Sequence, residues 1–216
     1  MRAILIPVKE FSRSKERLAP HYSEDQRTAL ARALCEDIFE VIGQVRGIDR
    51  VYVISGEDHA LDLARRRDWH AISEGEQISE SVSVDAASRL CAAEGVRALL
   101  RLPIDIPLVT PGDIEVLFAA LEPAPSVVIV PSRDGTGTNA LLRSPPDLFP
   151  SHFGPDSFTL HLNEAEQVGA KIKIIRNERI ALDIDEPKDL RAAADRGLSR
   201  SATARVMQQL RLRSTD

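Results

Sequence analysis

Short apolar runs alternate along this chain with longer stretches in which apolar residues recur at helical spacing. This alternation predicts an α/β fold, in which a mixed, mostly parallel sheet is covered by helices on both faces. A further strand at Thr138 to Leu142 is expected to run antiparallel to its neighbours. The other expected strands are Arg2 to Pro7, Val51 to Ser55, Ala98 to Pro103, Val127 to Pro131, Lys171 to Ile175 and Leu182 to Ile184.

Helices are expected between the strands, and several have recognisable ends. Ser23 is a candidate N-cap for the first helix, Thr110 followed by proline for the fourth, and Gly169 closes the fifth. The expected helices are Ser23 to Val45, Asp58 to Arg67, Ile78 to Ala93, Pro111 to Leu121, Asp156 to Val168 and Pro187 to Ala194.

The length of 216 residues suits one domain, which we expect to span residues 1–197. Residues 198–216 are expected to form an amphipathic helix or tail, since Ser199 to Arg213 places Val206 and Leu210 among arginines. This helix is expected to lie on the same chain or on the partner in a possible homodimer.

Composition excludes several classes of function. The net charge of -5 makes nucleic-acid binding a poor fit, because that affinity depends on cationic side chains. Cys35 and Cys91 lie in helical patterns without CxxC spacing, which favours neither a disulfide framework nor a zinc site. With neither a signal peptide nor a membrane span in view, we expect a cytoplasmic protein without a membrane partner.

Aspartates follow two apolar runs that lie far apart in the sequence. Asp105 follows the run ending at Pro103, while Asp183 and Asp185 lie two apart on an expected strand and therefore share one face. Carboxylates at strand ends suit Mg2+, and ligands of open α/β sheets bind outside the carboxyl ends of strands. The alternatives are a turn cap for Asp105 and a helix N-terminal role for Asp185 and Glu186 ahead of Pro187.

A basic segment follows the first expected strand. Lys9, Arg13, Lys15 and Arg17 lie close together there, where they could grip the phosphates of a nucleotide. Neither GxxxxGK[ST] nor GxGxxG follows the strand, so a standard P-loop and a dinucleotide fingerprint are excluded. The alternative is a solvated turn.

Two further segments offer donors for an anion. Two glycines flank Thr136 and permit close approach of the backbone to a ligand, while Thr136, Thr138 and Asn139 offer hydrogen-bond donors. A hairpin turn would also explain these residues. Gly154 and Ser157 precede or open a helix, whose N–H groups attract anions, although ordinary capping by Asp156 or Ser157 explains the same residues.

Taken in order, the segments IPVK, SKERL, PIDIPLVTPGDI, PSRDGTGTNALL, FGPDSFTLHLNEA and LDIDEPKDL resemble the phospholactate guanylyltransferase family of coenzyme F420 biosynthesis. The resemblance covers nearly the whole chain. It implies a Rossmann-like nucleotidyltransferase sandwich that transfers GMP from GTP to the phosphate of a small phosphorylated three-carbon acid, releasing pyrophosphate. The acid would be 2-phospho-L-lactate, phosphoenolpyruvate or 3-phosphoglycerate.

The resemblance also implies roles for individual residues. The metal ligands for Mg2+ would be Asp105, Asp183 and Asp185; the acceptor would lie on Thr136, Thr138, Asn139, Gly154 and Ser157; the catalytic groups would be Lys9, Lys15, Arg17 and Asp105; and the nucleotide would contact Pro7, Lys9, Lys15, Arg17, Glu80, Pro103 and Asp105.

One region departs from the family pattern. Ile78 to Ser83 replaces the Gly-Leu-Asn segment that opens the corresponding helix in many relatives, which leaves Glu80 to accept hydrogen bonds from guanine. The hydroxyls of Ser81 and Ser83 favour, weakly, an acceptor with a free hydroxyl such as 3-phosphoglycerate. The alternatives are a sugar-1-phosphate or molybdopterin nucleotidyltransferase and a non-catalytic nucleotide-binding regulator.

Overall fold

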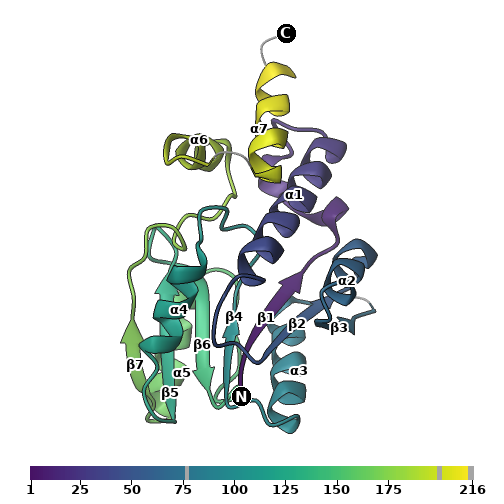
Figure 1. The fold of residues 1–216 in the computed structure, drawn as a ribbon. Helices are drawn as coiled ribbons and strands as arrows, with labels where there is room; N and C mark the ends of the chain where they lie inside the picture. Colours follow the sequence, from purple (N-terminus) through teal and green to yellow (C-terminus); the bar gives the residue numbers. More distant parts are fainter. Residues whose placement is uncertain (76–77, 199–200, 214–216) are drawn as a thin grey trace.

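A computed structural model describes residues 1–75, 78–198 and 201–213 of the chain (Figure 1). A seven-stranded sheet in the order β3-β2-β1-β4-β6-β5-β7 forms its centre. Every neighbouring pair is parallel except those of β6, which runs antiparallel to β4 and β5, as predicted. The strands are β1 (Arg2–Val8), β2 (Arg50–Ser55), β3 (His70–Ser73), β4 (Ala98–Arg101), β5 (Ser126–Pro131), β6 (Thr138–Ser144) and β7 (Lys171–Ile174).

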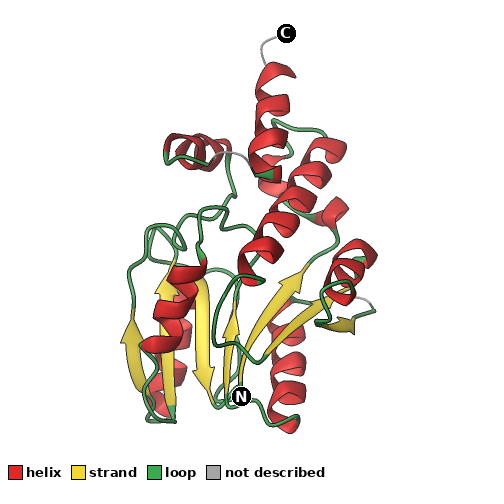
Figure 2. Cartoon of the chain, in the orientation of Figure 1, coloured by secondary structure: helices red, strands yellow, loops and turns green. Residues whose placement is uncertain are grey.

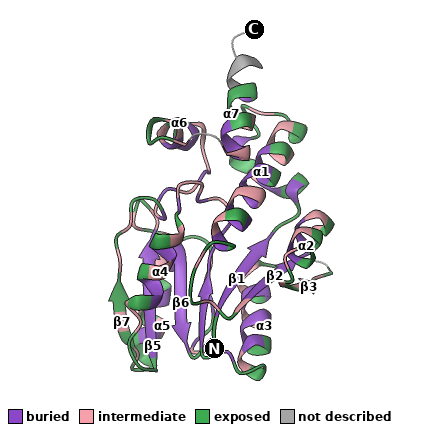
Figure 3. Cartoon of the chain, viewed as in Figure 1, coloured by how far each residue is buried: buried purple, intermediate pink, exposed green. Residues whose placement is uncertain are grey.

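Helices cover both faces of the sheet, which confirms the expected three-layer α/β architecture (Figure 2). One face packs on α1 (Glu24–Ile42), α2 (Asp58–Arg65) and α4 (Pro111–Ala119). The other packs on α3 (Glu80–Ala93) and α5 (Ser157–Gln167). The central strands are buried apart from Arg2 at the start of β1, whereas β7 at the sheet edge is largely exposed (Figure 3).

Local signals place the helix ends. Ser23 caps α1 through a capping box with Gln26, and Thr110 caps α4 through one with Asp113, so both predicted caps are confirmed. Gly169, just beyond α5, adopts a left-handed φ of 66°, which glycine tolerates without strain. Two short 3-10 helices, η1 (Phe11–Arg13) and η2 (Glu16–Leu18), lie in the loop after β1.

Two predictions about strands were wrong. Residues 182–184 are not a strand, although Leu182 and Ile184 are buried in alternation as a strand would require. The segment crosses the end of the sheet, and its backbone reaches the neighbouring loop through the Ile184 N–H, which donates to the Asp105 carbonyl. Strand β3 was missed, because its residues are only partly buried and its apolar pattern is short.

The C-terminal helices lie beyond the carboxyl end of β1. α6 (Pro187–Asp195) and α7 (Ala202–Arg213) share a small apolar cluster with α1, and the N-terminus of α7 is held by Asp37, which accepts from the Ala202 and Thr203 N–H groups. Helix α7 thus packs on its own chain, as one expectation had it. The predicted start at Ser199 lies outside the described residues. Among the described helices, none is long and apolar enough to cross a membrane.

A buried carboxylate joins α4 to the segment after β7. Asp113 accepts from the Thr110 N–H at 2.9 Å, from Asn177 Nδ2 at 2.7 Å and from Arg179 Nε at 2.7 Å. Burial opposes the charge, but these donors outweigh it and hold the pKa of Asp113 well below its ordinary range.

Replacing Asp113 with alanine is expected to lower the free energy of unfolding by about 3 kcal/mol, because Arg179 and Asn177 lose their shared acceptor. Asp62→Ala removes an exposed pair with Arg65 instead and should change it by less than about 0.5 kcal/mol. Urea unfolding at neutral pH measures both variants.

The same contribution depends on pH. Because the folded-state pKa of Asp113 lies below the unfolded value of about 3.9, the stabilisation is complete above that value and is lost as the pH falls below it. The difference between wild type and Asp113→Ala should therefore shrink in acid. A difference that stays constant down to about pH 3 would contradict this account.

Candidate functional site

A cleft of about 720 Å³ opens at the carboxyl ends of β1 and β4. The loops after these strands form one wall, and the β5–β6 hairpin, the start of α5 and the segment before α6 form the rest. This is the edge at which open α/β sheets bind ligands. All of the predicted site residues line the cleft, namely Pro7, Lys9, Lys15, Arg17, Glu80, Pro103, Asp105, Thr136, Thr138, Asn139, Gly154, Ser157, Asp183 and Asp185.

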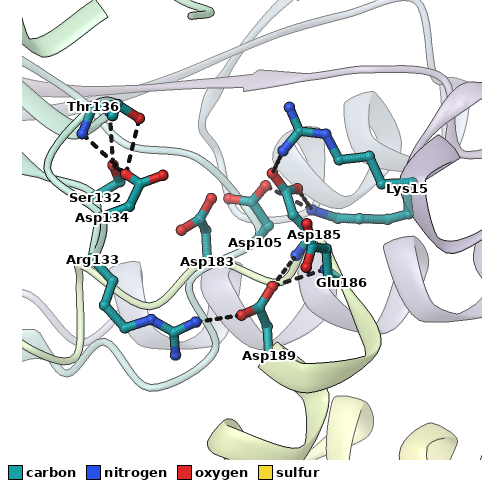
Figure 4. A network of polar contacts seen from close by, with 12 residues as sticks. Lys15, Asp105, Ser132, Arg133, Asp134, Thr136, Asp183, Asp185, Glu186 and Asp189 are labelled. Carbon is teal, nitrogen blue, oxygen red and sulfur yellow. Dashed lines mark hydrogen bonds and ion pairs between the residues drawn. The ribbon is translucent and has the colours of Figure 1, made fainter. Parts of the chain in front are cut away.

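A buried lysine lies between two of the predicted metal ligands (Figure 4). Lys15 Nζ is 2.7 Å from Asp105 Oδ2 and 3.6 Å from Asp185 Oδ1. The Lys15 backbone adopts a left-handed φ of 58°, a strained conformation that carries its side chain into the cleft wall. Burial opposes the charge, but the two carboxylates raise the pKa of Lys15 and Lys15 lowers that of Asp105.

Asp183 lies beside this pair but has a different environment. Its carboxylate accepts from Asn139 Nδ2 at 3.2 Å, and no cation pairs with it among the residues that the structure describes. Burial, together with the charges of Asp105 and Asp185, raises the pKa of Asp183 to about 6. Asn139 Nδ2 also donates to the Ile180 carbonyl at 2.9 Å, so this amide holds the Asp183 segment against β6.

The contacts of Asp105 and Asp185 test the turn and helix-capping roles that were the alternatives to metal binding. Glu186, rather than Asp185, forms the capping box of α6, together with Asp189. The Asp185 carboxylate instead faces Lys15, and the exposed Arg17 reaches it at 3.1 Å. Asp105 pairs with Lys15 through its side chain, and its carbonyl accepts from Ile184.

The three aspartates fit a hard divalent cation by their chemistry, since Mg2+ takes carboxylate oxygens as ligands. Asp183 supports this fit, because burial and the charges of Asp105 and Asp185 raise its pKa, and no cation among the described residues pairs with it. In the described part of the chain, however, no three acidic, histidine or cysteine side chains converge closely enough to form a metal site as they stand. The Lys15 ammonium lies between Asp105 and Asp185 instead.

The hairpin between β5 and β6 forms the opposite wall, so the predicted hairpin turn and the cleft involve the same residues. Asp134 ties the loop together, accepting from the Ser132 hydroxyl at 2.6 Å and from the Thr136 N–H at 3.0 Å. A Cβ at position 137 would lie 2.9 Å from Ser132 Oγ, which is too close, so only glycine fits at this position. The Thr136 hydroxyl also donates to the Asp134 carboxylate.

The start of α5 completes this wall. Asp156 occupies the N-cap position in a left-handed conformation but makes no side-chain capping bond, and no acidic residue lies in the first turn. The capping alternative is therefore not realised by Asp156. Ser157 is buried at the first helical position, and Gly154 is exposed beside it with a φ of 130°. The Ser157 and Phe158 N–H groups already donate to the Gly154 and Thr136 carbonyls, so this N-terminus offers an anion the positive end of the helix dipole rather than a set of free amides.

Sequence reasoning missed Arg101, Phe153 and His161. Arg101 is buried, ion-paired with Glu80, and stacked on the Phe153 ring at 4.1 Å. A single arginine inside the apolar run from Ala98 to Leu102 was the signal that could have revealed it. Glu80, expected to contact guanine, thus has a protein partner at the cleft edge.

Ser81 and Ser83, on which the preference for a hydroxylated acceptor was based, already have hydrogen-bond partners within the protein. Ser81 Oγ accepts from the Phe153 N–H at 2.8 Å, and Ser83 Oγ has both the Glu74 carboxylate and the Ser79 carbonyl within reach as acceptors for its one proton. Neither is among the residues that line the cleft. The preference for 3-phosphoglycerate therefore loses the residues on which it was based.

Relatives with similar sequences are guanylyltransferases. The phosphoenolpyruvate guanylyltransferase of Conexibacter woesei is 33% identical and is aligned over 93% of this chain and 90% of its own. The 2-phospho-L-lactate enzyme of Methanothermobacter thermautotrophicus is 31% identical, over 86% and 81%. The 3-phospho-D-glycerate enzyme of Colwellia psychrerythraea is 30% identical, over 88% and 90%.

Solved structures share the fold at low sequence identity. A candidate nucleotide-diphospho-sugar transferase from Desulfovibrio desulfuricans aligns with a TM-score of 0.76 and 16% identity, covering 97% of this chain and 95% of its own. A CMP:2-keto-3-deoxy-manno-octonic acid synthetase in complex with CTP aligns with a TM-score of 0.60 and 14% identity, covering 90% and 98%. The family described as "Guanylyl transferase CofC like" matches residues 1–212, and the chain therefore belongs to this family of nucleotidyltransferases.

Proposed function

We propose that this enzyme transfers GMP from GTP to the phosphate of a small phosphorylated three-carbon acid, in coenzyme F420 biosynthesis. The observation that carries the proposal is that one cleft is lined by both the aspartates around Lys15 and the donor-rich loops of Thr138 and Ser157. The acidic end suits a metal-bound triphosphate, and the start of α5, which has no side-chain cap and no acidic residue in its first turn, suits an anionic acceptor.

In this scheme the nucleotide lies along the wall formed by the loops after β1 and β4. Pro7 and Pro103 line that wall, and the exposed Lys9 and Arg17 lie where they can bind phosphates. Glu80, at the start of α3, would accept hydrogen bonds from guanine with the oxygen that Arg101 leaves free.

The chemistry requires no protein nucleophile. A phosphate oxygen of the acceptor attacks the α-phosphorus of GTP, and a new P–O bond forms as the bond to the bridging oxygen breaks. Pyrophosphate leaves with that electron pair. Lys15 would stabilise the charge that develops, and the donors around Thr138, Gly154 and Ser157 would hold the acceptor in line.

Asp105, Asp183 and Asp185 would hold Mg2+. When bound, the ion would neutralise charge on the α-phosphate and on the attacking oxygen. The raised pKa of Asp183 supports this assignment, because a nearby cation would favour its charged form.

The purified protein can be incubated with GTP, Mg2+ and one acid at a time, chosen from phosphoenolpyruvate, 2-phospho-L-lactate and 3-phospho-D-glycerate. We expect pyrophosphate release and a guanylylated product of matching mass with at least one acid. CTP and a sugar 1-phosphate serve as the comparison for the other nucleotidyltransferases. Turnover only with that pair, or none with any acid, would refute the proposal.

Asp105→Ala is expected to lower the turnover number by about 100-fold or more, which corresponds to roughly 3 kcal/mol of barrier. The reason is that the metal loses one carboxylate and Lys15 loses its 2.7 Å partner. Pyrophosphate release measures the effect, Asp62→Ala serves as the exposed control, and circular dichroism checks the fold. Near-normal turnover in Asp105→Ala would exclude this residue as a metal ligand.

Lys15→Met is expected to lower turnover by about 100-fold, because the ammonium that would stabilise the charge developing on the leaving phosphates is replaced by an apolar group of similar length. Lys171→Met is the matched control, since Lys171 is an exposed lysine at the start of β7, away from the cleft. Equal rates in the two variants would show that the Lys15 ammonium has no part in the reaction.

A further inference from the structure

A fully buried histidine lies directly behind the acceptor wall of the cleft. His161, on α5, has no exposed surface, and its Nδ1 is 3.0 Å from the Thr138 hydroxyl oxygen. Its Nε2 is 2.9 Å from the backbone N of His152, which donates to it. Thr138 lines the cleft, while His161 does not.

These two hydrogen bonds determine the tautomer of His161. A backbone N–H can only donate, so Nε2 must be the unprotonated nitrogen. A neutral imidazole carries one proton, which then resides on Nδ1 and is donated to Thr138 Oγ1. The reverse arrangement, in which Thr138 donates to Nδ1, would leave both ring nitrogens without a proton.

The ring is held in this state by its surroundings. Burial, together with the charges of Arg143 on β6, Arg101 on β4 and the neighbouring His152, lowers the pKa of His161 to about 3. The His152 ring itself pairs with Glu164 on α5. His161 is therefore neutral at physiological pH.

Aromatic packing fixes the orientation of the ring. Phe153 meets it edge to face with centroids 5.0 Å apart, and Phe149 lies 6.2 Å away on another side. Phe153 also lies against Arg101, so the His161 ring belongs to a packed layer directly beneath the cleft surface.

The consequence falls on the Thr138 hydroxyl. Its oxygen accepts from His161, and within the described part of the chain no other side chain or backbone group forms a hydrogen bond with this hydroxyl. Its backbone carbonyl is engaged separately by Arg101. The hydroxyl proton is therefore free to point into the cleft. The β-branched side chain has few χ1 rotamers, which keeps the hydroxyl oxygen beside His161.

We propose that His161 is a positioning residue that fixes the Thr138 hydroxyl as a hydrogen-bond donor toward an anionic oxygen of the acceptor. This inference rests on the proposed function, which places the acceptor at this end of the cleft. Ser157 lies one turn before His161 on the same face of α5 and also lines the cleft, so the helix supplies donors to the acceptor both directly and through Thr138.

Two substitutions of His161 separate its two hydrogen bonds. In His161→Asn the side-chain amide N–H overlays Nδ1 and retains the donor to Thr138, while the His152 N–H loses its acceptor. In His161→Gln the amide oxygen overlays Nε2 and retains that acceptor, while Thr138 loses its donor. Both variants lose the ring and one hydrogen bond, so they control for each other in packing.

His161→Gln should raise the KM for the acceptor by about tenfold, whereas His161→Asn should change it by less than about threefold. The KM for GTP should move little in either variant. Thr138→Val alone should raise the acceptor KM by about tenfold or more, and adding His161→Gln to it should bring no further increase. Equal increases in the Asn and Gln variants, or additive effects in the double variant, would overturn the proposal.

A second measurement does not depend on activity or on the variants. Nitrogen NMR of the wild-type imidazole should show the His161 proton on Nδ1, and a proton on Nε2 would overturn the inference. If the wild type transfers GMP to none of the three acids, the proposed function fails, yet this spectrum still decides the tautomer. The two failures are thus distinguishable.

Discussion

The buried ammonium of Lys15 is the constraint on which the cleft depends. Three aspartates approach one another at the carboxyl edge of the sheet, and two of them come from a segment far along the chain from the third. Without a cation between them, their repulsion in a partly desolvated cleft would oppose closing that segment over β4. Lys15 and the exposed Arg17 pair with Asp105 and Asp185, and among the described residues Asp183 is left without a paired cation, which a divalent ion would supply.

The core and the cleft differ in how far the sequence predicted them. The central strands and the caps at Ser23 and Thr110 follow from local signals, since apolar periodicity and capping chemistry act within a few residues. Strand β3 was missed because its residues are partly exposed and its pattern is short. The site residues were found as separate motifs, but nothing in their local pattern places Lys15 between Asp105 and Asp185.

The segment from Leu182 to Ile184 shows why alternation alone does not identify a strand. Its even-numbered residues are buried and its aspartates face the cleft, which is what a strand would provide. The backbone, however, meets the Asp105 carbonyl at one point, and Asn139 holds its start from β6. Asp183 and Asp185 thus both line the cleft, although not as residues on one face of a strand.

The two ends of the cleft differ in chemistry, and in the proposed reaction this difference would orient the substrates. Around Lys15 the wall carries three aspartates together with Lys9 and Arg17, which suits a triphosphate bound along with a cation. Around Thr138 the wall carries a hydroxyl whose oxygen is already engaged by His161 and the start of α5, which has no side-chain cap, although the Asp134 and Asp156 carboxylates also line this end. In the proposed reaction the acceptor would lie at the Thr138 end and the metal-bound triphosphate at the Lys15 end. The attacking phosphate would then approach the α-phosphorus from the side opposite to the leaving pyrophosphate, as in-line transfer requires.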